Sequence, residues 1–254
     1  MGRFEGSITV VTGGTSGIGR AVATRLGEEG AQVYLAGRDK ERGAAVAAEV
    51  TSRGGKGHFV HTDVSVDVDV ERLARTAAAE GRIDHWISNA GTEGPIGPMT
   101  GWDEQALREV LDTNLKGVLS GLRHASERMV RGGAIVDIAS FVGTALPVPI
   151  AVPYAAAKAG VVAAGRSAAP LLADSGIDVY TVCPWVVDTP MVDRLTGGAS
   201  DDKAGFAAGF APSGALTSAA DVARVVLDLL DGGLSARSGD AYLVDAGSTV
   251  TLLE

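Results

Sequence analysis

A tyrosine and a lysine four residues apart are the pair of side chains that most clearly suggests chemistry. Tyr154 and Lys158 share one face of a predicted helix, and Ser140 ends a predicted strand upstream of them. A phenol with an ordinary pKa of about 10 is a poor base near neutrality, but a nearby ammonium stabilises the phenolate and lowers that pKa. We therefore expect Tyr154 to act as a general acid/base, with Lys158 as its electrostatic partner. Ser140 would donate a hydrogen bond to a substrate oxygen on which charge develops.

A glycine-rich turn follows the first predicted strand, residues 7–11. It contains Gly13, Gly17 and Gly19 and leads directly into a predicted helix. Glycines permit positive φ and let the backbone approach a pyrophosphate, whose charge is favoured at a helix N-terminus. This pattern predicts nucleotide binding, although a plain glycine-rich turn between a strand and a helix has a similar composition.

Strands and helices are predicted to alternate along the whole chain. The predicted strands are 7–11, 33–36, 58–61, 83–88, 134–139, 177–182 and 241–244, and the predicted helices are 20–29, 39–53, 67–80, 102–130, 154–172 and 219–230. Alternation of this kind predicts an α/β fold, a single Rossmann-type doubly wound domain over residues 1–254. Its sheet would be parallel with about seven strands, helices on both faces and a ligand site at the carboxyl ends of the strands. The segment 188–218 is too long for an ordinary connection, which predicts a substrate lid.

Composition excludes several classes of function. The 254 residues carry a net charge of −9 with no Lys/Arg cluster, which argues against nucleic-acid and anionic-membrane partners. One cysteine, Cys183, excludes an internal disulfide framework and is expected to be a small core residue; the four histidines form no metal-ligand pattern, so we expect no metal. The uncharged stretch 138–157 contains three prolines and is not expected to span a membrane. No signal peptide is apparent, and a cytoplasmic protein is expected.

The motifs, taken in order, resemble those of the short-chain dehydrogenase/reductase family. Residues 12–19 resemble its T-G-x-x-x-G-I-G motif, and residues 89–91 resemble its N-A-G motif. Ser140 and Tyr154-x-x-x-Lys158 are similar to its catalytic residues, and Asn114 to its helix asparagine. The resemblance runs from about residue 5 to about residue 247, and Pro184 and Thr189 fit a further family motif in part.

The resemblance implies a role for each of these residues. Asn114, Ser140, Tyr154 and Lys158 would form the catalytic set: Lys158 would also hold the nicotinamide ribose, and Asn114 would anchor a water that relays protons to it. Alternatively, Asn114 is a polar residue that kinks its helix. The cofactor-binding residues would be Gly13, Thr15, Ser16, Gly17, Ile18, Gly19, Arg38, Asp63, Val64, Asn89, Ala90, Gly91, Tyr154, Lys158, Pro184, Val187 and Thr189. The family also implies a homo-oligomer, a tetramer or dimer, although Pro170 is expected to kink the helix that a regular helix-pair contact would use.

Arg38 favours NADP(H) over NAD(H). The acidic residue that would bind a ribose 2′-hydroxyl is missing after the second predicted strand, and a guanidinium suits a 2′-phosphate. Alternatively, Arg38 is solvated and Asp39 merely caps the next helix. Ser16 stands where some NADP-dependent relatives have a basic residue. Asp63 and Val64 resemble an adenine contact, with an N-cap role for Asp63 as the alternative.

Trp185 stands where the family usually has glycine, and it would either narrow the substrate pocket or turn against the lid. The expected pocket residues are mostly apolar, which suggests a hydrophobic or cyclic alcohol or ketone: Glu93, Phe141, Val142, Trp185 and Met191, with Leu195, Phe206 and Phe210. The expected function is therefore hydride transfer between a nicotinamide cofactor and a small-molecule secondary alcohol or ketone. The alternatives are a catalytically silent nucleotide-sensing protein and a dehydratase or epimerase that retains its cofactor.

Overall fold

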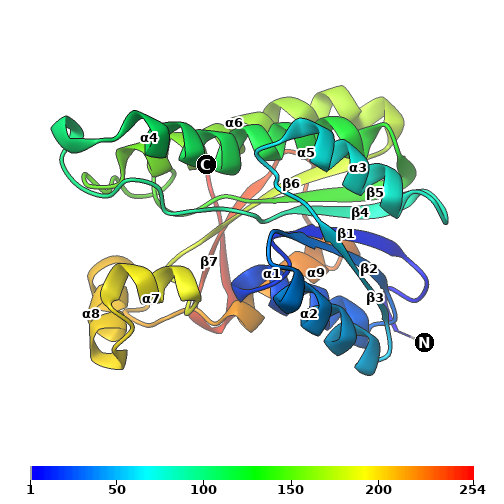
Figure 1. The fold of residues 1–254 in the computed structure, drawn as a ribbon, viewed down its shortest axis with the longest axis horizontal. Helices are drawn as coiled ribbons and strands as arrows, with labels where there is room; N and C mark the ends of the chain where they lie inside the picture. Colours follow the sequence, from blue (N-terminus) through cyan, green and yellow to red (C-terminus); the bar gives the residue numbers. More distant parts are fainter. Residues whose placement is uncertain (1) are drawn as a thin grey trace.

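The computed structural model describes residues 2–254. These residues form one eight-stranded sheet with helices around it (Figure 1). The order across the sheet is β3-β2-β1-β4-β5-β6-β7-β8. Strands β1 to β7 pair in parallel, and β8 pairs antiparallel with β7. The strands are β1 Ile8–Thr12, β2 Gln32–Gly37, β3 Lys56–His61, β4 Ile83–Ser88, β5 Met129–Ile138, β6 Asp178–Pro184, β7 Ala241–Asp245 and β8 Thr249–Leu252.

Helices cover both faces of this sheet, as expected for a doubly wound α/β fold (Figure 1). One face carries α1 (Gly17–Glu28), α2 (Lys40–Ser52) and α9 (Ala219–Leu230). The opposite face carries α3 (Asp67–Ala77), α4 (Glu104–Leu111), α5 (Gly117–Ser126) and α6 (Val152–Leu172). Helices α7 (Pro190–Thr196) and α8 (Ser200–Phe210) form a separate unit after β6, within the segment predicted as a lid.

The core lies in two layers, one on each face of the sheet. Successive residues Val10 and Val11 of β1 are fully buried but pack into different layers, because side chains alternate along a strand. Val11 joins the layer that contains Leu26 of α1, and Val10 joins the layer that contains Leu73 of α3. Burial on both faces explains why a central strand such as β1 is a nearly continuous apolar run, whereas the edge strands β3 and β8 are half-buried or exposed.

The structure differs from the sequence-based expectations in three respects. The single helix expected over 102–130 is wrong: α4 ends at Leu111, a π-helical turn spans Asp112–Lys116, α5 ends at Ser126, and β5 already begins at Met129. Strand β8 was not expected, because it is short and follows β7 through the tight turn Ala246–Ser248. Pro170 lies in the last turn of α6, so it removes a backbone donor only where the helix ends, and the helix continues to Leu172.

Within residues 2–254, no helix combines the length and apolar character needed to cross a bilayer. In the same part of the chain, no three His, Cys, Asp or Glu side chains are grouped in a way that could hold a metal ion.

Candidate active site

A cleft of about 1060 Å³ opens at the carboxyl ends of the parallel strands. Its lining comes from the turns after β1 to β6 and from α6, α7 and α8, so residues far apart in the sequence meet there. The predicted site residues line this cleft with two exceptions, Gly19 and Asn114. This is the position at which doubly wound sheets bind their ligands.

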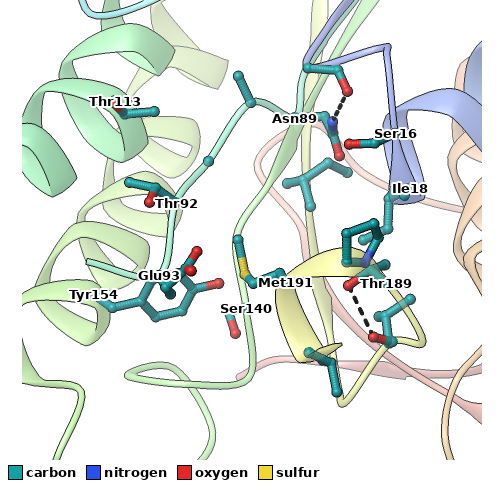
Figure 2. A pocket seen from close by; sticks show the side chains of 18 of the residues that line it. Ser16, Ile18, Asn89, Thr92, Glu93, Thr113, Ser140, Tyr154, Thr189 and Met191 are labelled. Atoms are coloured by element: carbon teal, nitrogen blue, oxygen red, sulfur yellow. Dashed lines mark hydrogen bonds between the residues drawn. The ribbon is translucent and has the colours of Figure 1, made fainter. Parts of the chain in front are cut away.

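Strand β5 and helix α6 bring the predicted catalytic side chains together. Ser140 follows β5, and Tyr154 and Lys158 occupy successive turns of α6. Figure 2 shows the hydroxyl of Tyr154 directed toward Ser140 inside the cleft. The ammonium of Lys158 is 5.8 Å from the centre of the Tyr154 ring and donates a 2.7 Å hydrogen bond to the carbonyl oxygen of Ile138. The ammonium therefore lies near the face of the phenol ring and is hydrogen-bonded to the last residue of β5, two residues before Ser140.

Burial dominates the titration of both groups. It raises the pKa of the Tyr154 phenol to about 12, and a hydrogen bond with Ser140 opposes this rise. Burial also lowers the pKa of the Lys158 ammonium to about 8, against the attraction of Cys183 and Asp137. Desolvation of the phenolate is therefore the larger effect on Tyr154, and the lowering of its pKa that was expected from Lys158 stays a prediction.

Asn114 lies behind the cleft and is completely buried in the π-helical turn. Its side-chain oxygen accepts a 2.8 Å hydrogen bond from the backbone N–H of Thr92, and its amide donates one of 2.8 Å to the carbonyl of Thr92. Gly91 leaves the space between Asn114 and Lys158 open: a Cβ at that position would lie 3.3 Å from Oδ1 of Asn114 and 3.7 Å from Nζ of Lys158. This geometry is compatible with both hypotheses for Asn114, a water anchor beside Lys158 and a polar residue that interrupts its helix.

The turn after β1 fits a pyrophosphate. Gly13 has a φ of +63° and packs so closely that a Cβ would lie 2.8 Å from Cα of Ala90. Ser16 precedes α1 without capping it through its side chain, so the first N–H groups of this helix are available to an anion. Gly19 packs against the carbonyl of Gly13, where a Cβ would be 2.3 Å from the oxygen. Gly19 is thus needed for the shape of the turn and does not itself line the cleft.

Asn89 fixes this turn against β4. Its amide donates to the carbonyl oxygens of Thr12 and Gly13 at 3.0 and 3.2 Å. In return, the Thr12 hydroxyl accepts from the backbone N–H groups of Asn89 and Ala90 at 2.9 and 3.1 Å. These four hydrogen bonds hold the two adjacent loops in a fixed relation, which preorganises a backbone cradle for a dinucleotide.

Arg38 is exposed at the edge of the cleft after β2, where it lines the surface together with Asp39 and Arg42. Asp39 caps α2 by accepting from the backbone N–H of Arg42 at 2.9 Å, and it also accepts from Nε of Arg42 at 2.7 Å. Arg42 was not among the expected site residues. The sequence did contain a signal for Arg42. A helix capped by Asp39 places Arg42 in its first turn, beside Arg38 at the same edge of the cleft.

Asp63 does not cap the following helix. The N-cap of α3 is Val66, and the carboxylate of Asp63 instead accepts from the backbone and hydroxyl of Ser65 at 2.9 and 2.7 Å. Asp63 and Val64 both line the cleft. The alternative reading of Asp63 as an N-cap is therefore wrong.

Aromatic side chains line the end of the cleft near α7 and α8. Trp185 stacks on Phe141 with 4.7 Å between ring centres and an angle of 21° between the planes. Phe210 of α8 lies 6.0 Å from Phe141, and Phe206 lies 4.9 Å from Phe210. Trp185 therefore lines the cleft and also belongs to the apolar cluster that includes α8. Trp185 can therefore both narrow the substrate pocket and pack against the predicted lid.

Several further residues line the cleft without having been expected there. Thr92 and Arg194 are the most polar of those near Glu93, and Val148 and Ile150 extend the apolar lining. Thr92 directly follows the N-A-G motif at residues 89–91, which was the available signal for it. Val148, Ile150 and Arg194 carry no such signal, because their approach to the cleft depends on the path of the chain after β5.

Comparison with known proteins identifies the family. A family model described as enoyl-(acyl carrier protein) reductase matches residues 13–249, which is most of the chain. The chain belongs to the short-chain dehydrogenase/reductase family. The resemblance seen in the motifs is thereby confirmed, together with the expected Rossmann-type fold.

Relatives of this family member include two named alcohol dehydrogenases. The chain is 39% identical to a 3beta-hydroxysteroid dehydrogenase of Mediterraneibacter gnavus, over 76% of this chain and 71% of that protein. It is 38% identical to a cis-4-hydroxycyclohexanecarboxylate dehydrogenase of Sinomonas cyclohexanicum, over 97% and 98% of the two chains. A short-chain dehydrogenase of Burkholderia cenocepacia in complex with NADP superposes with a TM-score of 0.87 at 28% identity, over 97% and 99% of the chains. This short-chain dehydrogenase/reductase is thus an oxidoreductase.

Proposed function

We propose that the protein transfers a hydride between NADP(H) and a secondary alcohol or ketone. The observation that carries this proposal is the convergence of two hydroxyl groups, on Ser140 and Tyr154, in a cleft whose other end is a glycine turn suited to a pyrophosphate. Two donors aimed at one position suit a substrate oxygen whose charge changes during reaction. The alcohol dehydrogenases among the relatives support the same chemistry.

The chain supplies positioning and proton transfer. A bound nicotinamide cofactor would accept or provide the hydride at the substrate carbon. During ketone reduction, Ser140 donates a hydrogen bond to the carbonyl oxygen and Tyr154 gives its proton to that oxygen as it becomes an alcohol. During alcohol oxidation, Tyr154 receives the proton back. Lys158 keeps positive charge beneath Tyr154, and Asn114 holds the loop at Thr92 beside this path.

The preference for NADP(H) is supported by the two guanidinium groups that line the cleft after β2, Arg38 and Arg42. Asp39 is occupied with capping α2 and with Arg42, so it is less available to accept from a ribose 2′-hydroxyl. Steady-state KM values for NADPH and NADH test this preference. A hundredfold preference for NADH would overturn it, and Arg38→Ala should weaken NADPH binding more than NADH binding.

We also propose that residues 188–218 cover the substrate within a single catalytic domain. The segment contains α7 and α8, whose Met191, Phe206 and Phe210 line the cleft. Arg194 of α7 donates two hydrogen bonds to Glu93 on the loop after β4, so an ion pair already connects this segment to another loop that lines the cleft. Such covers exclude water while the reaction proceeds.

Replacement of Tyr154 by phenylalanine tests the reaction. Tyr154→Phe should bind NADPH with wild-type affinity, measured by fluorescence titration, and should lower kcat on cyclic ketones by about 10²- to 10⁴-fold. Ser140→Ala is the companion variant and should also lose about 10²-fold or more in kcat. Turnover of Tyr154→Phe within tenfold of the wild type would reject the acid/base role.

A panel of substrates separates this proposal from its rivals. A silent sensor would bind NADPH without oxidising it in the presence of any ketone. A dehydratase or epimerase would convert its substrate without net change in NADPH absorbance at about 340 nm. Reduction confined to an enoyl thioester, with no ketone accepted, would contradict the proposed chemistry.

A further inference from the structure

The charged groups around the cleft are divided unevenly between its two ends. Among the described residues that line it, the cationic side chains are Arg38, Arg42, Lys158 and Arg194. Arg38 and Arg42 follow β2 at the glycine-turn end, and Lys158 is 3% exposed and attached to the backbone of β5. Arg194 is therefore the cation at the end where the aromatic side chains gather.

Arg194 is already neutralised by a carboxylate. Its Nε donates to Glu93 at 2.7 Å, and its Nη2 donates to the second oxygen of Glu93 at 2.9 Å. A parallel pair of charge-assisted hydrogen bonds is the most favourable arrangement between a guanidinium and a carboxylate. The Glu93 side chain is only 22% exposed, and its bonds with Arg194 hold the pKa of its carboxyl below the ordinary value. The pair thus remains ionised and mutually satisfied over the physiological range.

Among the described residues that line this end of the cleft, no second side chain is cationic. Phe141 and Trp185 form a stacked pair, and Phe210 and Met191 add apolar surface. The other charged side chains that line the neighbouring side, Glu109 and Asp112, are acidic. A substrate carboxylate would have either to displace Glu93 or to bind the N–H groups of Arg194 that Glu93 does not use, where the two carboxylates would repel each other.

We propose that the Glu93–Arg194 pair is a charge filter that restricts this site to neutral alicyclic alcohols and ketones and rejects carboxylated ones. The proposal rests on the alcohol–ketone chemistry proposed above and adds the substrate class to it. The two named relatives illustrate both possibilities, since one acts on a hydroxysteroid and the other on a hydroxycyclohexanecarboxylate. The filter predicts that this protein prefers neutral substrates, and Glu93 is the residue that determines this preference.

The test compares two alcohols of similar ring size, 4-methylcyclohexanol and cis-4-hydroxycyclohexanecarboxylate, with NADP⁺. The wild type should favour the neutral alcohol at least hundredfold in kcat/KM. Glu93→Gln keeps the size and the hydrogen-bonding oxygen but frees the charge of Arg194, so it should lower this preference at least tenfold by raising kcat/KM for the carboxylate. The double variant Glu93→Gln with Arg194→Gln removes both charges and should restore the preference for the neutral alcohol.

A structural role alone gives a different pattern. If the pair merely ties α7 to the loop after β4, kcat/KM for both alcohols falls together in Glu93→Gln and their ratio does not change, which would overturn the proposal. A wild-type enzyme that prefers the carboxylate would also overturn it.

Binding of an unreactive probe separates the filter from the proposed reaction. Cyclohexanecarboxylate is titrated calorimetrically into wild-type and Glu93→Gln protein saturated with NADP⁺. At least tenfold tighter binding to Glu93→Gln supports the filter even if neither alcohol is turned over, in which case the proposed reaction fails and the filter stands. Equal affinity for the two proteins refutes the filter whatever the outcome for catalysis.

Discussion

The ammonium of Lys158 donates a 2.7 Å hydrogen bond to the carbonyl oxygen of Ile138. This contact joins α6, which carries Tyr154, to β5, which leads to Ser140. Tyr154 and Lys158 are thereby held on a helix that is bonded to the end of β5, and Ser140 lies two residues beyond that strand. Sites on regular elements are positioned more accurately than sites on loops, so the relation between the two hydroxyl groups depends on this buried lysine.

Replacement of Lys158 by methionine should separate activity from stability. Burial lowers the pKa of Lys158 to about 8, so the folded state holds this proton less tightly than the unfolded state does. Stability of the wild type therefore rises with pH between about 8 and the ordinary lysine pKa of about 10.4, and the cost of the buried charge is fully present below pH 8. Lys158→Met should thus lose turnover while its Tm at pH 7 exceeds that of the wild type.

Thermal unfolding at pH 7 and at pH 10 checks this expectation. The gain in Tm of Lys158→Met should be larger at pH 7 than at pH 10. A variant that is less stable than the wild type at pH 7 would mean that the hydrogen bond to Ile138 outweighs the cost of burying the charge.

Removal of the Asn114 side chain should weaken the loop after β4. Asn114→Ala leaves the backbone N–H and carbonyl of Thr92 without their two 2.8 Å partners. The free energy of unfolding should fall by about 1–3 kcal/mol, as measured by urea denaturation. Asn114→Asp is the matched variant, because it keeps the acceptor for the N–H of Thr92 but loses the donor to its carbonyl. It should lie between the wild type and Asn114→Ala if the two hydrogen bonds contribute separately.

The helix interruption at Asn114 illustrates what the sequence could not specify. Periodicity favours one helix over 102–130, but the structure inserts a π-helical turn where Asn114 bonds to Thr92. That bond joins residues 22 positions apart, so its effect on the helix depends on tertiary contact. Strand β8 is a different case, because the turn before it contains Gly247 at a φ of +66° and begins with Asp245, which is a hairpin signal that could have been recognised.

The cofactor end of the cleft was more predictable than the substrate end. Gly13 and Ser16 belong to a local turn whose fit to a pyrophosphate follows from its own backbone, and both line the cleft. The ion pair between Glu93 and Arg194 joins the loop after β4 to α7 across 101 positions of sequence, so Glu93 was expected in the pocket while its partner was not. Likewise, the pKa of the Tyr154 phenol depends on burial, and the i, i+4 spacing of Tyr154 and Lys158 does not reveal how buried the phenol is.

Replacement of Trp185 by glycine should enlarge the substrate site. The variant removes an indole that stacks on Phe141 and lines the cleft. The ratio of kcat/KM for a bulky alcohol, such as a 3-hydroxysteroid, to kcat/KM for cyclohexanol should rise at least tenfold. Trp102→Gly is the matched control, because Trp102 does not line the cleft and its indole donates to the carbonyl of Gly97 at 3.4 Å. An equal change of the ratio in both variants would mean that Trp185 acts only through packing.

Asp137 should make the stability of the fold depend on pH between about 4 and 7. This residue of β5 is completely buried, and neither oxygen has a hydrogen-bond partner within 3.5 Å. Burial raises the pKa of its carboxyl to about 7, against the opposing effects of Ser88 and Lys158. Between the ordinary aspartate pKa of about 3.9 and pH 7, the folded state binds a proton that the unfolded state has released, so stability falls as pH rises through this window.

Replacement of Asp137 by asparagine removes that proton uptake. Asp137→Asn keeps the shape of the side chain and should be more stable than the wild type at pH 7.5, with a smaller difference at pH 4.5. Tm values at these two pH values measure the effect, and Asp174→Asn, at an exposed position, is the control that should show no comparable pH-dependent difference. If the gain in Tm of Asp137→Asn is the same at both pH values, the wild-type carboxyl does not take up a proton on folding in this range. Asp137 is then a buried carboxylate paired with the Lys158 ammonium.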